Sequence, residues 1–177
     1  LVNRDRDKNG LPPLTYDERL ADVARSHSAD MQKSKFFDHE SPTYGRLEQR
    51  LTRAGYVYVT SRENLAEAPT IEEAQAGLLR SPHHYENLMA TDITAIGVGI
   101  VRGGPNDPRN LAVTQIFATP GKQETDLEAA RGAESQIRAA RTKAGLSSLP
   151  RLPKLDEMAK RHMDAISANL TEGNLKP

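Results

Sequence analysis

Two apolar runs in the middle of the chain constrain its fold more than any other feature. Residues 93–101 read ITAIGVGIV and residues 111–117 read LAVTQIF, and both are rich in the β-branched side chains that favour strands. The segment between them, 103–108, is Gly-Gly-Pro-Asn-Asp-Pro, a composition typical of turns. The pattern predicts two antiparallel strands joined as a hairpin.

Helical patterns precede this hairpin and predict the layers that cover it. Residues 15–31 carry apolar side chains at spacings of three and four, and Thr15 opens a capping box at their start. Residues 47–54 predict a second, short helix, and residues 70–80 predict a third, which Pro82 interrupts and which then resumes. We expect an α/β (α+β) fold in which a small antiparallel sheet lies between helical layers.

Shorter signals predict the segments around these elements. Residues 1–14 are polar and end in turn-forming residues, which indicates a lead segment and a turn. Residues 56–59 indicate a brief strand, and we expect Glu63 and Asn64 to lie in a turn after it. Residues 118–123 (ATPGKQ) indicate a linker.

Composition excludes several classes of function. The 24 basic and 24 acidic residues balance, which argues against a nucleic-acid partner. No apolar run approaches the length of a membrane span, and the absence of cysteine excludes disulfides and thiolate zinc sites. The chain starts at Leu1 rather than methionine, so we expect a removed signal peptide and an extracellular or cell-envelope location.

Histidine marks the candidate chemistry, because the chain has only five. His83 and His84 lie side by side with Glu86 close behind, and His39 lies in a loop after two phenylalanines, Phe36 and Phe37, that we expect to anchor it. His27 lies on the apolar face of the first predicted helix. There we expect a buried imidazole bonded to a backbone carbonyl.

The end of the chain repeats its beginning. Laid on the N-terminus with a shift of 135, residues 136–166 give eight identities over about 30 positions, including Gly145-Leu146 on Gly10-Leu11 and His162 on His27. The copy then stops, since no later element recurs. Either the natural protein continues, or a degenerate copy is kept as a C-terminal helical appendage that buries its apolar face on the first domain or on a neighbouring molecule.

An ordered set of short motifs covers most of the first 120 residues. In chain order they are Asn3 and Arg6 with Gly10-Leu11 and Leu14, Leu20, Ala24 and His27, Phe37-Asp38-His39-Glu40-Ser41-Pro42, Arg50-Leu51, Ala54-Gly55-Tyr56, Glu63-Asn64-Leu65-Ala66, Ser81-Pro82, His84 and Asn87, Ile96-Gly97-Val98-Gly99, and Thr114-Gln115 with Phe117. This set resembles the CAP superfamily, also called the SCP or sperm-coating-protein domain, in its short, cysteine-free bacterial form. The resemblance implies a three-layer α-β-α sandwich for residues 1–120, with residues 121–177 as linker and appendage.

The resemblance also implies a cleft lined by two histidines and acidic side chains. Carried over by position, these are His39, His84 and Glu63, a ligand set for zinc or another divalent metal. The alternative is a hydrogen-bonded His–Glu pair that stabilises the cleft. A second glutamate, common in the family before the second histidine, is missing here because Ser81 occupies that region, and Glu86 is the nearest substitute.

Three functions stay open on this basis. The first is a secreted or cell-envelope binding module, for which the resemblance suggests a lipid, sterol or peptide ligand. The second is a metal-dependent, peptidase-like hydrolase with His39, Glu63 and His84 as candidate catalytic residues. The third is a structural module that self-associates through residues 136–170. The missing acid favours the binding module.

Overall fold

The computed structural model describes residues 1–122, 126–147, 153–154, 157–158 and 160–161, and divides the chain into two units, Leu1–Gln123 and Glu124–Pro177. Each unit is described by itself. No helix in these described ranges is both long and apolar enough to cross a membrane.

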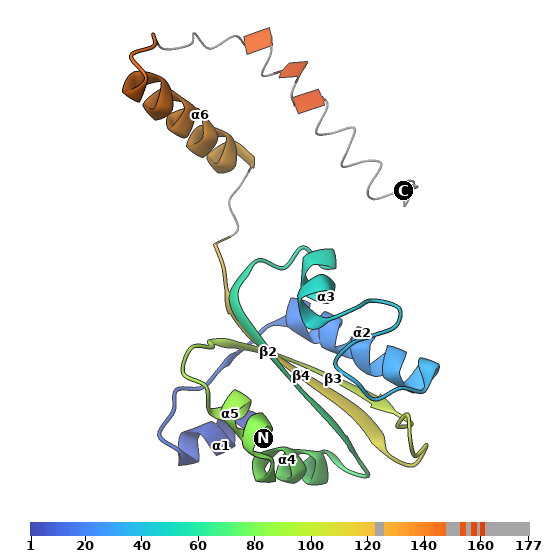
Figure 1. Ribbon diagram of the computed structural model, residues 1–177. Coiled ribbons are helices and arrows are strands. Elements are labelled where there is room, and N and C mark those ends of the chain that lie inside the picture. Colours follow the sequence, from blue (N-terminus) through green and yellow to red (C-terminus); the bar gives the residue numbers. More distant parts are fainter. Residues whose placement is uncertain (123–125, 148–152, 155–156, 159, 162–177) are drawn as a thin grey trace. The chain divides into compact units, whose positions relative to one another are not determined.

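A four-stranded sheet forms the middle layer of the first unit (Figure 1). The strands β3 (Ala95–Arg102) and β4 (Leu111–Pro120) pair antiparallel, which confirms the predicted hairpin. The long strand β2 (Tyr58–Ala68) pairs antiparallel with β4, while the short β1 (Thr15–Tyr16) pairs parallel with β3. The sheet order is β1-β3-β4-β2, so the sheet is mixed rather than purely antiparallel.

Helices cover both faces of this sheet, which confirms the α-β-α sandwich (Figure 1). On one side lie α2 (Glu18–Ser34) and α3 (Leu47–Arg53), and their apolar residues share a core with β3 and β4 around Leu20, Leu51 and Ile116. On the other side lie the remaining helices of the unit, α1 (Val2–Lys8), α4 (Ile71–Arg80) and α5 (Pro82–Met89), over a second core that contains Phe117 and Leu88.

Several local predictions were wrong because tertiary contacts outweigh local signals. The polar lead forms helix α1, since buried Arg6 donates hydrogen bonds to the Leu88 and Ala90 carbonyls of the α5 end. Asp17, not Thr15, caps α2, because Thr15 is paired in β1.

The region around Glu63 and Asn64 was also predicted wrongly. Both residues lie inside β2, paired with Ile116 and Gln115 of β4, rather than in a turn. The linker predicted at residues 118–123 also begins later than expected, because residues 118–120 belong to β4.

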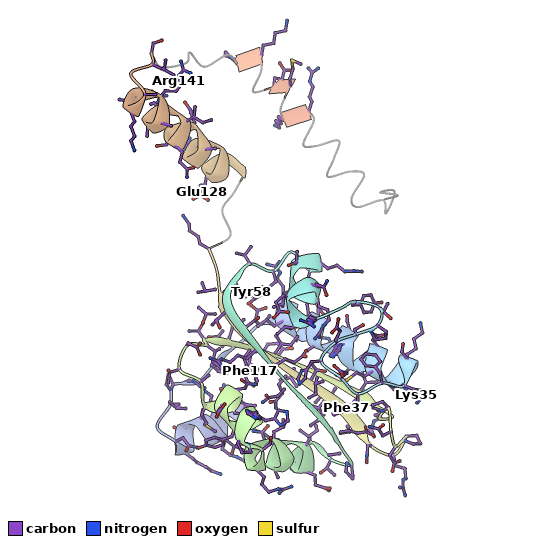
Figure 2. All side chains as sticks on the ribbon, viewed as in Figure 1. Lys35, Phe37, Tyr58, Phe117, Glu128 and Arg141 are labelled. Atoms are coloured by element: carbon purple, nitrogen blue, oxygen red, sulfur yellow. The ribbon has the colours of Figure 1, made fainter. Side chains whose placement is uncertain are left out.

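The loop before His39 is anchored by one of its two phenylalanines only. Phe36 is half-buried and contacts the ring of His27. Phe37 is 40% exposed and lies near the end of α2, whereas Phe117 lies among the side chains that fill the interior (Figure 2).

In the second unit, α6 (Asp126–Lys143) ends with the same geometry as α1. The amide of Leu11 donates to the carbonyl of Arg6, and the amide of Leu146 donates to that of Arg141. Gly10 and Gly145 both have φ of +69°, a left-handed conformation that favours glycine. The side chains match too, since Arg6 Nε donates to the Pro12 carbonyl and Arg141 Nε to the Ser147 carbonyl.

Candidate functional site

The site is built around a buried ion pair between β2 and α3. Glu63 and Arg50 each have a side chain that is 4% exposed. Arg50 Nη1 donates to Glu63 Oε2 at 2.8 Å, and Arg50 Nη2 donates to Glu63 Oε1 at 3.0 Å. Two parallel bonds of this kind give Arg–carboxylate pairs their strength and fixed geometry. The pair therefore fixes the Glu63 carboxylate at the edge of the sheet.

His39 completes this cluster from the loop between α2 and α3. Its Nδ1 lies 2.8 Å from Glu63 Oε1, while 57% of its side chain remains exposed. Arg50 Nη2 also donates to the backbone carbonyl of His39, so one guanidinium holds both the carboxylate and the loop. The sequence-based prediction that Glu63 pairs with a histidine is thus confirmed in the structure.

Two buried residues of α2 hold the rest of this loop. His27 Nε2 donates to the Asp38 carbonyl at 3.0 Å, as predicted for a buried imidazole. Asp30 accepts hydrogen bonds from the hydroxyls of Ser41 and Thr43. The loop that carries His39 is therefore fastened on both sides of the imidazole.

His84 reaches the site from α5, where it is half-buried. Asn64 Nδ2 donates to the His84 carbonyl at 3.1 Å. Asn87 Nδ2 donates to Asn64 Oδ1 and to the Glu63 carbonyl. These side-chain amides join α5 to β2. They bring Glu63 and Asn64 next to Asn87, although the residues are far apart in the sequence.

His83 and Glu86 lie outside this arrangement. Their side chains are 94% and 72% exposed, and they face each other with His83 Nδ1 3.8 Å from Glu86 Oε2. His83 is therefore surface-facing. In this geometry Glu86 does not replace the missing second acid.

The cluster shifts the pKa values of its members in opposite directions. The hydrogen bond that His39 donates to Glu63 raises the pKa of His39 above its usual value. Burial and the nearby charges of His39 and His83 lower the pKa of His84. Burial alone would raise the pKa of Glu63, but the hydrogen bonds from His39 and Arg50 outweigh burial and lower that pKa. Between the two imidazole pKa values, His39 is charged and His84 is neutral.

We expect an NMR pH titration to resolve this order. The His39 ring should titrate above about 6.5 and the His84 ring below that value. Because the folded-state pKa of His39 is raised, its contribution to stability is complete below the unfolded-state pKa and is lost as pH rises through the folded-state pKa. In His39→Gln the pKa of His84 should rise, since one neighbouring positive charge is removed. Coincident titration of both rings in the wild type would contradict the geometry.

The donor set fits a metal poorly in this arrangement. Both oxygens of Glu63 already accept hydrogen bonds, and Arg50 neutralises its charge. Within the described ranges, no three histidine, aspartate or glutamate side chains are grouped as a metal site. The assignment of His39, Glu63 and His84 as metal ligands therefore stays a prediction.

The comparisons with known proteins decide the family. The model of the cysteine-rich secretory protein family, CAP, matches residues 1–117. This chain belongs to the CAP family. The CAP domain is 41% identical over 105 residues to the uncharacterized protein YkwD of Bacillus subtilis, a match that covers 59% of this chain and 41% of that protein. It is 37% identical over 106 residues to the uncharacterized membrane protein YlbC of the same species, covering 58% and 30%.

Solved structures agree with the CAP assignment. An extracellular protein containing an SCP domain from Bacillus anthracis matches with a TM-score of 0.59 and 34% identity, over 67% of this chain and 37% of that one. An outer surface protein from Borrelia burgdorferi shares the fold, with a TM-score of 0.61 and 22% identity over 68% and 87%. The chain thus spans about two fifths or less of the curated relatives it matches. These bacterial relatives support the expected bacterial, cysteine-free CAP form.

Sequence reasoning missed the role of Arg50 in the CAP site. Arg50 appeared there only as part of a motif, with no partner assigned. Its position in the sequence indicates that it is buried, because an arginine one residue before the buried Leu51 lies beside the apolar face of α3. A buried guanidinium needs hydrogen-bond acceptors, and for Arg50 the structure supplies the Glu63 carboxylate.

Proposed function

We propose that this CAP domain is an extracellular or cell-envelope binding module that holds a lipid acyl chain. The location follows the Bacillus anthracis relative, which is described as extracellular and is 34% identical. The ligand class follows from the surface of the first unit. Of the lipid, sterol and peptide ligands considered from the sequence, the lipid fits this surface best.

The observation that carries the proposal is an apolar groove on the face of the sheet covered by α1 and α4. Its volume is about 300 Å³, and its apolar lining comes from both helices and from β3 and β4. Four large apolar side chains at the groove stay 39–55% exposed, which are Leu1, Tyr16, Ile71 and Ile100. Exposed apolar patches of this kind mark interaction sites. The small volume suits a single acyl chain better than a sterol ring system.

The Glu63 geometry supports binding over metal-dependent hydrolysis. A hydrolase needs a carboxylate free to accept a proton or to hold a metal-bound water. Here Arg50 and His39 engage both Glu63 oxygens. We therefore propose that Glu63 fixes the His39 loop.

The proposal is tested by titration with dodecanoate in a fluorescent-lipid displacement assay. We expect Ile100→Glu to weaken binding by about tenfold or more, since a charge replaces an apolar contact in the groove. Ile100 is 39% exposed, so the fold should tolerate the change. Val59→Glu is the matched control, because Val59 is 76% exposed and lies outside the groove lining.

Two outcomes would contradict this function. The first is equal affinity of the wild type and Ile100→Glu. The second is cleavage of a peptide or ester substrate that a chelator abolishes and that His84→Ala also abolishes, which would establish the hydrolase instead.

We also propose that residues 136–166 are an incomplete copy of the N-terminal part of the CAP domain and contact a neighbouring molecule. The support is the matching end of α1 and α6, together with the exposure of Ile137 (54%) and Leu146 (54%). The predicted match of His162 to His27 lies outside the described residues. Light scattering should show more than one chain per particle for the full chain and a single chain per particle for residues 1–123. The same number of chains per particle in both samples would contradict self-association.

A further inference from the structure

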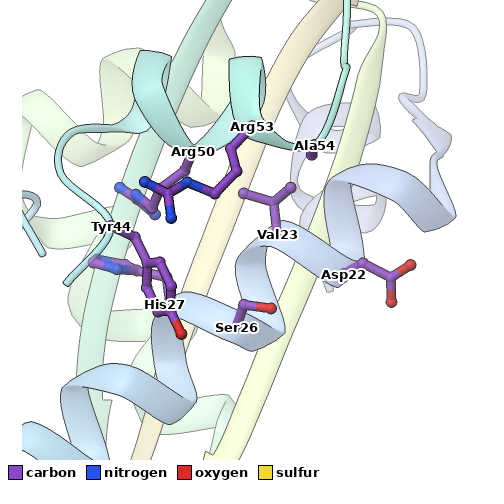
Figure 3. Close-up of a pocket in the computed structure, with 8 residues that line it drawn as sticks. All are labelled: Asp22, Val23, Ser26, His27, Tyr44, Arg50, Arg53 and Ala54. Carbon is purple, nitrogen blue, oxygen red and sulfur yellow. The ribbon is translucent and has the colours of Figure 1, made fainter. Parts of the chain in front are cut away.

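A second pocket lies between α2 and α3, and Arg50 forms part of its wall (Figure 3). Its volume is about 280 Å³, at the small end of ligand pockets. In Figure 3, Arg50 and Arg53 extend from α3, His27 and Val23 belong to α2, and Tyr44 comes from the loop between these two helices. The complete lining is Asp22, Val23, Ser26, His27, Tyr44, Arg50, Arg53 and Ala54.

His27 lines this pocket and has an unused hydrogen-bond acceptor. The imidazole is fully buried, and its Nε2 lies 3.0 Å from the Asp38 carbonyl. A carbonyl only accepts, so Nε2 carries the proton and Nδ1 carries a lone pair. Burial also lowers the pKa of His27, which keeps the ring neutral. Within the described chain, Nδ1 has no hydrogen-bond partner.

Arg50 lines the same pocket and has an unused donor. Its two terminal nitrogens bind Glu63 and the His39 carbonyl, but its Nε is buried without a partner among the described residues. A buried donor and a buried acceptor left unpaired each lower the stability of the unliganded protein. A molecule that satisfies both atoms regains that free energy on binding.

Charge and shape narrow the chemistry of this molecule. Arg50 is neutralised by Glu63, and Asp22 shares Arg25 with Glu18. Arg53 lies over the Tyr44 ring at 5.5 Å, and no carboxylate pairs with it in the described ranges. Arg53 therefore brings to the pocket a positive charge without a paired carboxylate, beside the apolar surfaces of Val23, Ala54 and the Tyr44 ring.

We infer that this pocket binds a small carboxylate that carries a neutral hydrogen-bond donor on its α-carbon, such as an N-acyl amino acid. The carboxylate accepts from Arg50 Nε and faces Arg53, the N–H donates to His27 Nδ1, and the side chain packs against Val23 and Tyr44. The site is separate from the groove under α1 and α4, since the two linings share no residue. The inference therefore stands whether or not the lipid is the other ligand.

Three small probes test each element of this recognition. N-acetylleucine has the carboxylate, the donor and an apolar side chain, while 4-methylpentanoate lacks the donor and N-acetylleucinamide lacks the carboxylate. By titration calorimetry, we expect N-acetylleucine to bind at least about tenfold more tightly than either of the others. NMR should show the His27 ring resonances shifting with N-acetylleucine alone.

Variants of Arg53 test the role of its charge in binding. Arg53→Gln should weaken N-acetylleucine about tenfold, because a charge-assisted hydrogen bond is lost, and Arg53→Lys should restore part of the affinity. Arg46→Gln is the control, since Arg46 is another exposed arginine and lines the hollow beside His39 instead. The inference is overturned if N-acetylleucine does not bind, if the three probes bind alike, or if Arg46→Gln weakens binding as much as Arg53→Gln.

Discussion

Arg50→Met is expected to destabilise the CAP domain by about 3–5 kcal/mol, because it leaves a buried carboxylate without its cation. Glu63 has 4% of its side chain exposed, so water cannot replace the guanidinium. The same substitution removes the donor to the His39 carbonyl, which should also loosen the loop. Urea unfolding at neutral pH measures the loss of stability, and hydrogen exchange in residues 38–43 measures the loosening.

The stability lost in Arg50→Met is expected to depend on pH. In the wild type the pKa of Glu63 is lowered, so its stabilising contribution is present above the unfolded-state pKa and is lost as pH falls through the folded-state value. In Arg50→Met the unpaired Glu63 should have a raised pKa. The difference between the two proteins should therefore shrink as pH falls.

Two variants control this result. Arg50→Met with Glu63→Gln should recover part of the stability, because no buried charge remains. Arg53→Met, one turn later on α3 and exposed, should cost no more than about 1 kcal/mol. A loss at Arg50 no larger than the loss at Arg53 would show that the pair does not hold the site.

Gly97→Ala should be nearly as damaging, with an expected loss of about 3 kcal/mol or more. A Cβ at Gly97 would overlap the backbone of α2 at Leu20 and Ala21, and one at Gly99 would overlap it at Ala24 and Arg25. These glycines let α2 lie directly on β3. Backbone cannot yield as a flexible side chain can, so the helix must move away from the sheet. Thermal unfolding should show the loss as a lower midpoint.

Gly77→Ala is the matched control for this change. Gly77 lies inside α4, and a Cβ there would meet nothing within 4 Å. Alanine is favoured over glycine in helices by roughly 0.5–1 kcal/mol, so this variant should be slightly more stable than the wild type. If Gly97→Ala and Gly77→Ala unfold at the same temperature, the close helix–sheet contact does not contribute as described.

The sequence by itself determined the elements whose signals are local. The hairpin of β3 and β4 followed from two apolar runs around a turn, and α2 followed from its apolar spacing. The buried, carbonyl-bonded state of His27 followed from its place on that helix face. Such features depend on residues a few positions apart, where backbone propensity and periodicity act directly.

Only the tertiary structure decided which distant groups meet. Arg50 and Glu63 are 13 positions apart, and Asn64 reaches the carbonyl of His84 across 20. The same contacts turned the expected lead segment into α1 and the expected turn into part of β2. They also left Glu86 at the surface and placed two residues with an unpaired buried atom, His27 and Arg50, in the wall of one pocket. No local pattern encodes these outcomes, because they arise from the free energy of burying charged and polar groups together once the helices have packed on the sheet.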